Sequence, residues 1–155
     1  MPELPILYLD VDGVLQYAKD NQWKPRPDAA EFLQWAVTRF RCRWLTNWIN
    51  PNDEIPRQLG VHVPTGIREV VWRIAGPRYP FKAAAISDAE DWLWLEDQPS
   101  DFDLADLRRR KQLDRLIRTD HVRPWILMSF VRQELIKRLQ QSNSADDRDR
   151  LAGAG

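Results

Sequence analysis

The sequence predicts an α/β fold in which a parallel β-sheet lies between two layers of helices. Short apolar runs of strand length alternate with segments of helical periodicity, and polar side chains directly follow several of these runs. With 155 residues, 43% of them hydrophobic and 30% charged, the chain has the size and composition of one globular domain. We expect that domain over residues 1–140, followed by a flexible tail over residues 141–155.

The N-terminal part of the chain predicts two strands and one helix. Residues 6–11 form an apolar run that ends in aspartates, which is typical of a buried parallel strand. The polar stretch over residues 13–27 indicates a turn and a loop. Asp28 can cap a helix that extends to about residue 39, and residues 41–46 form the second strand.

The middle of the chain is less regular. A short helix over residues 50–59 has a proline near its start and a glycine directly after it. Residues 61–63 and 69–74 are candidates for short strands, although the second segment is also compatible with a helical turn. Residues 82–88 form a helical segment that opens with a lysine.

The C-terminal part repeats the alternation of strand and helix. Residues 92–95 form a buried strand, which an acidic loop over residues 96–103 follows. Residues 104–111 predict a helix and residues 113–118 predict the last strand. The helix over residues 125–140 has a strong apolar stripe, so we expect it to cover one face of the sheet.

Polar groups stand where the expected strands end or a helix begins, which is where open parallel sheets bind their ligands. These residues are, in chain order, Asp10, Asp12, Gly13, Thr46, Asn47, Lys82, Glu96, Asp97 and Asp101. If the strands are neighbours, several carboxylates converge with one hydroxyl and one ammonium. Crowded carboxylates are costly to desolvate, and Mg²⁺, which prefers oxygen ligands, removes that cost. Together with the lysine, the ion would form a cradle for a dianionic phosphate.

Four segments resemble the motifs of the haloacid dehalogenase (HAD) superfamily, and they occur in that superfamily's order. LYLDVDGVL resembles the first motif, an apolar strand followed by DxDG, and WLTN resembles the second, a strand that ends in Thr or Ser. Lys82 resembles the isolated lysine of the third motif, and LEDQPSD resembles the acidic fourth motif. The resemblance covers residues 4–101 and implies a three-layer Rossmannoid fold.

Further details are similar to the small bacterial HAD proteins that are grouped with "Swiss Army Knife" RNA-repair modules. Trp48 follows the threonine of the second motif, and Asn52 stands just beyond it. The chain also ends in an expected strand, a Thr119-Asp120 step and a final helix. This resemblance implies a small phosphatase that acts on nucleic-acid ends or on another bulky phosphoester.

The HAD resemblance implies a reaction through an aspartyl-phosphate. Asp10 would attack phosphorus, and it needs no activating base because a carboxylate is already ionised at pH 7. Asp12 would protonate the leaving oxygen and then deprotonate the attacking water. Thr46 and backbone N–H groups near Asn47 would bind phosphate oxygens, and Lys82 would neutralise charge on the nucleophile and the transferring group.

The same resemblance implies a Mg²⁺ ion. Asp10, the backbone carbonyl of Asp12, and Asp97 would hold it, and it would offset charge on the phosphoryl oxygens. The acidic loop allows two interpretations, either an acidic pair of Glu96 and Asp97 or a DxxxD pattern of Asp97 and Asp101. Because Asp97 belongs to both, we expect it to be the direct ligand, while Glu96 or Asp101 acts through a water.

The spacing of the motifs leaves no room for a sizeable cap domain. Residues 13–45 hold a loop, one helix and a strand, and residues 47–81 hold little more. An open site suits bulky phosphoesters, because no lid closes over the substrate. Gly13, Asn47 and Arg118 are the residues that we expect beside the substrate.

Bulk properties exclude some classes of protein and leave others open. The 23 basic and 23 acidic residues give no net charge, so any nucleic acid must bind a local patch. With one cysteine and no apolar run long enough to span a bilayer, we expect a cytoplasmic protein without an obligate protein partner. Taken singly, each motif is compatible with a turn, a strand residue or a solvated charge. The alternatives are a non-catalytic HAD-fold module that binds phosphate or nucleic acid, and a phospho-receiver domain.

Overall fold

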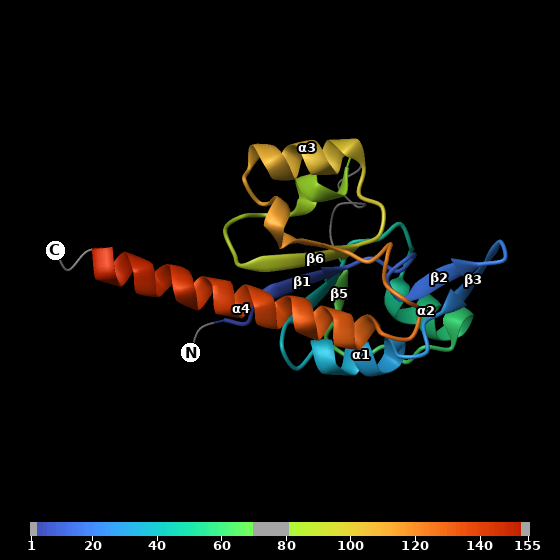
Figure 1. The fold of residues 1–155 in the computed structure, drawn as a ribbon. Helices are drawn as coiled ribbons and strands as arrows, with labels where there is room; N and C mark the ends of the chain where they lie inside the picture. Colours follow the sequence, from blue (N-terminus) through green and yellow to red (C-terminus); the bar gives the residue numbers. More distant parts are fainter. Residues whose placement is uncertain (1–2, 70–80, 153–155) are drawn as a thin grey trace.

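The centre of the fold is a five-stranded sheet in which the neighbouring strands are parallel (Figure 1). The computed structural model describes residues 3–69 and 81–152, with the backbone alone at residues 69, 139 and 142–152. Across the sheet the strand order is β5-β4-β1-β6-β7. In that order the strands are Arg68–Glu69, Arg41–Trp44, Ile6–Leu9, Trp92–Glu96 and Leu116–Arg118. The predicted parallel sheet is confirmed.

The register of the sheet brings the ends of four strands to one edge. Leu9, the last residue of β1, pairs with Trp44 of β4 and with Leu95 of β6. One position further, Glu96 pairs with Arg118 at the end of β7. Because these pairs are in register, the segments that follow the four strands start side by side.

Helices cover both faces of the sheet, as the alternation of elements predicted (Figure 1). The helices α1 (Ala29–Ala36) and α4 (Leu127–Ala152) lie on one face. The helix α3 (Asp101–Arg109) lies on the other face and contacts the 3₁₀ turn η2 (Lys82–Ala85). This arrangement gives three layers, with the sheet in the middle.

Two apolar cores result from the alternation of side chains along the strands. Leu7 and Leu9 of β1 belong to the core beneath α1 and α4, whereas Ile6 and Tyr8 belong to the core on the α3 side. The fully buried tryptophans that anchor these cores are Trp44, Trp92 and Trp94. Within the described residues, no helix has both the length and the apolarity needed to cross a bilayer.

An antiparallel hairpin replaces the loop expected over residues 13–27, so that expectation is wrong. The strands β2 (Gln16–Lys19) and β3 (Gln22–Pro25) pair around Asp20 and Asn21, which have φ values of 53° and 59°. A two-residue turn with two positive φ angles suits the twist of a hairpin, and Asn and Asp tolerate it. Since β3 is exposed along its whole length, it lacks the alternating apolar pattern that predicts a strand.

Two helices are longer than predicted. α3 begins at Asp101 because Ser100 caps it, three residues before the expected start at residue 104. α4 continues past residue 140 to Ala152, and the sequence holds no glycine or proline over that stretch until Gly153. By contrast, α2 (Pro51–Leu59) has nearly the expected bounds and ends at Gly60 in the left-handed conformation.

Other short segments also differ from the predictions. The expected helix over residues 82–88 is only the 3₁₀ turn η2, and residues 113–115 form a 3₁₀ turn, η3 (Leu113–Arg115), ahead of the last strand. Residues 61–63 form no strand. Of the segment over residues 69–74, only its first residue is described, and it belongs to β5.

Candidate active site

Asp10 is buried at the carboxyl edge of the sheet, directly after β1. Its Oδ2 lies 2.9 Å from the ammonium nitrogen of Lys82, and that nitrogen lies 2.6 Å from Oε2 of Glu96. The backbone N–H of Val11 donates a hydrogen bond to Oδ1 of Asp10 at 2.8 Å. The structure therefore brings together a carboxylate after β1, the first residue of η2 and the last residue of β6.

The two carboxylates compete for one ammonium. Burial and the neighbouring Asp10 raise the pKa of Glu96 from its usual 4.5 to about 9, although Lys82 acts in the opposite direction. Burial lowers the pKa of Lys82, but Asp10 and Glu96 outweigh burial, so that its pKa is raised above the usual value. Lys82 therefore remains charged at neutral pH, and its single charge does not keep both carboxylates ionised.

Asp97 adds a third carboxylate to this cluster. One oxygen each of Asp10, Glu96 and Asp97 lie within 4.8 Å of one another. Both oxygens of Glu96 are engaged, because Oε1 accepts hydrogen bonds from the backbone N–H groups of Asp97 and Gln98 and Oε2 accepts one from Lys82. The Asp97 side chain interacts with that of Glu96 but forms no ion pair with a lysine or arginine of the described residues, so it is the more available metal ligand.

Gly13 makes room for Asp97. Its φ angle is +75°, in the region that L-residues with a side chain rarely adopt. A Cβ atom at this position would overlap the carboxylate carbon and Oδ2 of Asp97. The glycine after Asp12 therefore does more than allow a sharp turn, since it lets the acidic loop after β6 approach the loop after β1.

Asp12 points to a separate group of partners. Its Oδ1 accepts hydrogen bonds from the side-chain amide of Gln16 at 2.5 Å and from the indole N–H of Trp48 at 3.0 Å. Gln16 begins the hairpin, and Trp48 lies in the loop after β4. The sequence drew attention to Trp48 only through the HAD resemblance, whereas the role of Gln16 was missed because no motif marks it.

Thr46 is buried beside this group, and its hydroxyl oxygen accepts a hydrogen bond from the backbone N–H of Trp48 at 3.3 Å. Asn47 is exposed on the same loop. Both residues lie at the carboxyl edge of β4, the strand next to β1. Their loop is thus adjacent to the Asp10–Gly13 loop, as the sequence predicted.

The remaining two predicted residues, Arg118 and Asp101, lie outside the carboxylate cluster. Arg118, at the end of β7, donates hydrogen bonds to the backbone carbonyl of Asp97 and to the Asp120 carboxylate, both at 3.2 Å. It therefore supports the acidic loop from outside. Asp101 is exposed in the first turn of α3 and does not belong to the carboxylate cluster of the described residues. Of the two interpretations of the acidic loop, the geometry favours the pair of Glu96 and Asp97.

Asp103 was missed, and it positions the lysine. Its Oδ1 accepts a hydrogen bond from the backbone N–H of Ala83 at 2.7 Å, directly after Lys82. Its Oδ2 accepts hydrogen bonds from the backbone N–H and the hydroxyl of Ser100, both at 2.8 Å. The spacing of serine and aspartate is that of a capping box and could have indicated the start of α3.

Arg26 was missed as well, and it links the Asp10–Gly13 loop to the far end of the chain. It is buried, and its guanidinium donates to the carbonyl of Gly13 at 3.1 Å and to that of Arg123 at 2.9 Å. Further hydrogen bonds reach the carbonyls of Thr119 and Val122. The Thr119 hydroxyl donates to the same Gly13 carbonyl at 2.8 Å. No sequence signal marks an arginine inside a polar stretch for such a role.

The chain matches no protein-family model, no curated protein and no solved structure. The HAD resemblance therefore remains an interpretation of the motifs and of their order. What the site can do follows from its geometry and its chemistry.

The cluster suits a hard divalent cation. If all are ionised, Asp10, Glu96 and Asp97 carry three negative charges against the single positive charge of Lys82. A divalent cation at the three oxygens would offset this excess and would lower the pKa of Glu96 again. Such oxygen donors suit hard cations in general and select no single metal.

Proposed function

We propose that this protein is a Mg²⁺-dependent phosphomonoester hydrolase of the HAD type that forms an aspartyl-phosphate on Asp10. One observation carries the proposal: the buried Asp10 carboxylate contacts Lys82, and one of its oxygens lies within 4.8 Å of an oxygen of the Asp97 carboxylate. A nucleophilic carboxylate beside an ammonium and a metal ligand can approach a dianionic phosphate without prohibitive repulsion.

The first half of the proposed reaction transfers the phosphoryl group. An oxygen of Asp10 forms a bond to phosphorus as the bond to the leaving oxygen breaks. Asp12 gives its proton to that oxygen, and Lys82 neutralises charge on Asp10 and on the phosphoryl group. Asp10, Asp97 and the backbone carbonyl of Asp12 would hold Mg²⁺, which would supply charge compensation for the phosphoryl oxygens.

The second half releases phosphate. Asp12, now ionised, removes a proton from a water molecule that attacks phosphorus, and Asp10 is regenerated. The two hydrogen bonds that Oδ1 of Asp12 accepts from Gln16 and Trp48 support this role, because they hold the side chain in one orientation. Thr46 and the N–H groups of its loop bind the phosphate oxygens.

The surroundings of the site support an open, uncapped enzyme with a bulky substrate. Between Gly13 and Leu45 the chain forms only the hairpin, α1 and β4. Exposed aromatic side chains lie on segments at the carboxyl edge: Trp23 of the hairpin is 50% exposed, Phe102 of α3 is 73% exposed, and Trp125 ahead of α4 is 61% exposed. Such rings can stack on bases, so we include phosphorylated nucleic-acid ends among the substrates.

The test is a panel of phosphomonoesters, including 5′- and 3′-phosphorylated oligonucleotides, with and without Mg²⁺. We expect turnover that requires Mg²⁺ and that Asp10→Asn abolishes while the circular dichroism spectrum is unchanged. Activity that survives in Asp10→Asn would refute the nucleophile. An aspartyl-phosphate that persists for hours without turnover would instead indicate a phospho-receiver.

A further inference from the structure

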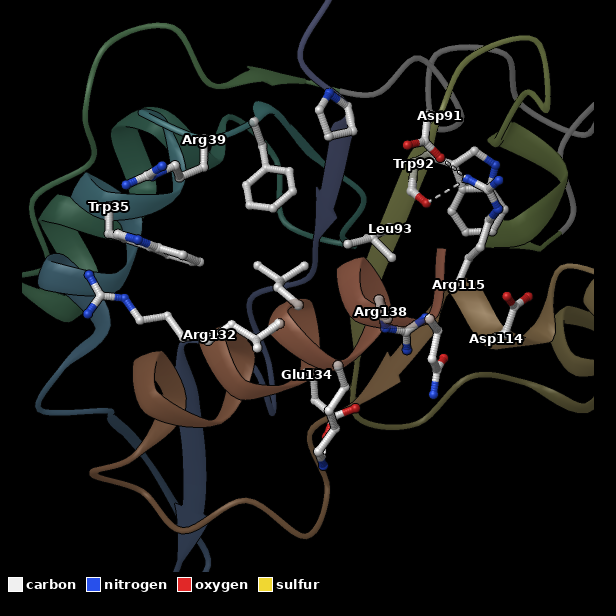
Figure 2. A pocket seen from close by; sticks show the side chains of 16 residues that line it. Trp35, Arg39, Asp91, Trp92, Leu93, Asp114, Arg115, Arg132, Glu134 and Arg138 are labelled. Atoms are coloured by element: carbon white, nitrogen blue, oxygen red, sulfur yellow. Dashed lines mark hydrogen bonds and ion pairs between the residues drawn. The ribbon is translucent and has the colours of Figure 1, made fainter. Parts of the chain in front are cut away.

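A groove of about 990 Å³ lies at the amino-terminal edge of the sheet, opposite the candidate active site (Figure 2). Pro5 precedes β1, Phe40 precedes β4, and Asp114 precedes β7, and all three line the groove. The helix α4 forms one wall. None of the residues assigned to the proposed reaction belongs to it, so its role is separate from that reaction.

The floor of the groove is apolar. Phe40, Leu93 and Leu135 line it, and Ile136 on α4 is 54% exposed beside them. An isolated exposed isoleucine is ordinary, but one that adjoins an apolar groove extends the surface that a partner can bury. Aliphatic side chains would fit this floor, and their burial would contribute to binding.

Two arginines at one end of the groove form no ion pair with any acidic side chain that the structure describes. Figure 2 draws Arg39 and Arg132 on either side of Trp35, and the Arg132 guanidinium lies 5.2 Å from the centre of that ring. Neither arginine forms an ion pair within residues 3–69 and 81–152. At the other end, Arg115 pairs with Asp91. The free positive charge is therefore concentrated around Trp35, where carboxylates could bind two guanidinium groups.

We propose that this groove binds an acidic amphipathic helix of a partner protein. Aliphatic residues on one face of that helix would fill the floor, and its acidic residues would pair with Arg39 and Arg132. A nucleic-acid strand fits less well, because stacking needs an open ring face. Trp92 is only 1% exposed, and Arg132 covers Trp35.

The test is a selection from a random 16-residue peptide library displayed on phage, with the full-length protein as target. We expect enriched peptides that carry glutamate or aspartate beside aliphatic residues at helical spacing. Their affinity for the double variant R39E/R132E should be at least tenfold weaker than for the unchanged protein. The matched control is R57E/R109E, which reverses two exposed arginines on α2 and α3 and should change the affinity less than twofold.

Three results would overturn the proposal: peptides without acidic residues, equal binding to R39E/R132E, or preferential binding of a single-stranded oligonucleotide to the groove. Self-association through the groove, seen as a dimer by light scattering that R39E/R132E abolishes, would also overturn it. Phosphatase activity is measured on the same variants and is expected to be unchanged. The peptide-binding result therefore tests the groove independently of the proposed phosphatase activity.

Discussion

Glu96 differs from the other two carboxylates of the site because both of its oxygens already accept hydrogen bonds. It holds Lys82 with one oxygen and the start of the acidic loop with the other. Such a residue organises the site, while Asp97 remains available for a cation. Its raised pKa follows from this position, since a buried group beside Asp10 resists ionisation.

The raised pKa of Glu96 predicts that the metal-free protein loses stability as the pH rises from about 4.5 to about 9. Over this window the folded state keeps the Glu96 proton, whereas the unfolded chain releases it. Rising pH therefore favours unfolding through this group. Urea unfolding in EDTA at several pH values measures how steeply the free energy of unfolding falls as the pH rises. Glu96→Gln, which cannot ionise, should flatten this dependence, and an unchanged slope in that variant would contradict the assignment.

Gly13→Ala tests the approach of the two acidic loops. The new Cβ would meet the Asp97 carboxylate and would also need a positive φ, so we expect a loss of more than about 1 kcal/mol of stability and weaker Mg²⁺ binding. Gly60→Ala is the matched control, because Gly60 has a φ of +64° and no atom within 4 Å of the added carbon. Thermal unfolding and metal titration compare the two. Equal effects would show that the overlap with Asp97 is unimportant.

At the level of elements, the cap of α3 also determines where Lys82 stands. Asp103 bonds both Ser100 and the backbone of Ala83, so one carboxylate joins the start of a helix to the turn that carries the lysine. The 3₁₀ turn η2 is too short to fix its own position. Lys82 is therefore placed by packing against α3, on the same face of the sheet.

Asp103→Ala should cost about 2–3 kcal/mol, since it removes the cap and leaves the buried N–H of Ala83 without an acceptor. We also expect it to lower turnover, because Lys82 loses its support. Ser100→Ala removes the cap but keeps the bond to Ala83, and it should cost about 1 kcal/mol with little effect on turnover. Urea unfolding and steady-state kinetics separate the two effects. If both variants lost equal activity, the link to Lys82 would be wrong.

Elements with strong apolar patterns could be predicted from the sequence, whereas those stabilised by other forces could not. The strands β1 and β6 are continuous apolar runs, and β4 alternates arginines with the buried Cys42 and Trp44, so the existence of these strands and their polar ends were evident. The hairpin over Gln16–Pro25 was missed because it is mostly exposed, and a turn rather than a core defines it. The same distinction applies to the site residues. The acidic residues at strand ends could be predicted because they follow apolar runs. The roles of Gln16 and Asp103 could not, because they depend on tertiary contacts.

At the scale of the whole molecule, the site exists only because distant segments meet at one edge of the sheet. Strand register places the starts of the loops after β1, β4, β6 and β7 side by side. It does not fix the positions that the rest of these loops take relative to one another. Arg26 supplies that constraint between the hairpin, the loop at Gly13 and the segment from Thr119 to α4. Its burial lowers its pKa while Asp28 and Asp97 act in the opposite direction, and its guanidinium donates its hydrogen bonds to backbone carbonyls.

Arg26→Met should therefore destabilise the whole domain rather than one loop. Removing the guanidinium abolishes four hydrogen bonds from a charged donor and leaves the Val122 carbonyl without a donor among the described residues, whereas the carbonyls of Gly13, Thr119 and Arg123 each keep one. We expect a loss of about 3 kcal/mol. Arg26→Lys keeps the charge but not the forked donor geometry, so it should recover only part of the loss. Urea unfolding gives the free energies, and hydrogen exchange locates the change. Because Arg26 joins the hairpin to the start of α4, faster exchange should appear at both ends of this link. Faster hydrogen exchange in the hairpin alone would show that Arg26 stabilises only that element.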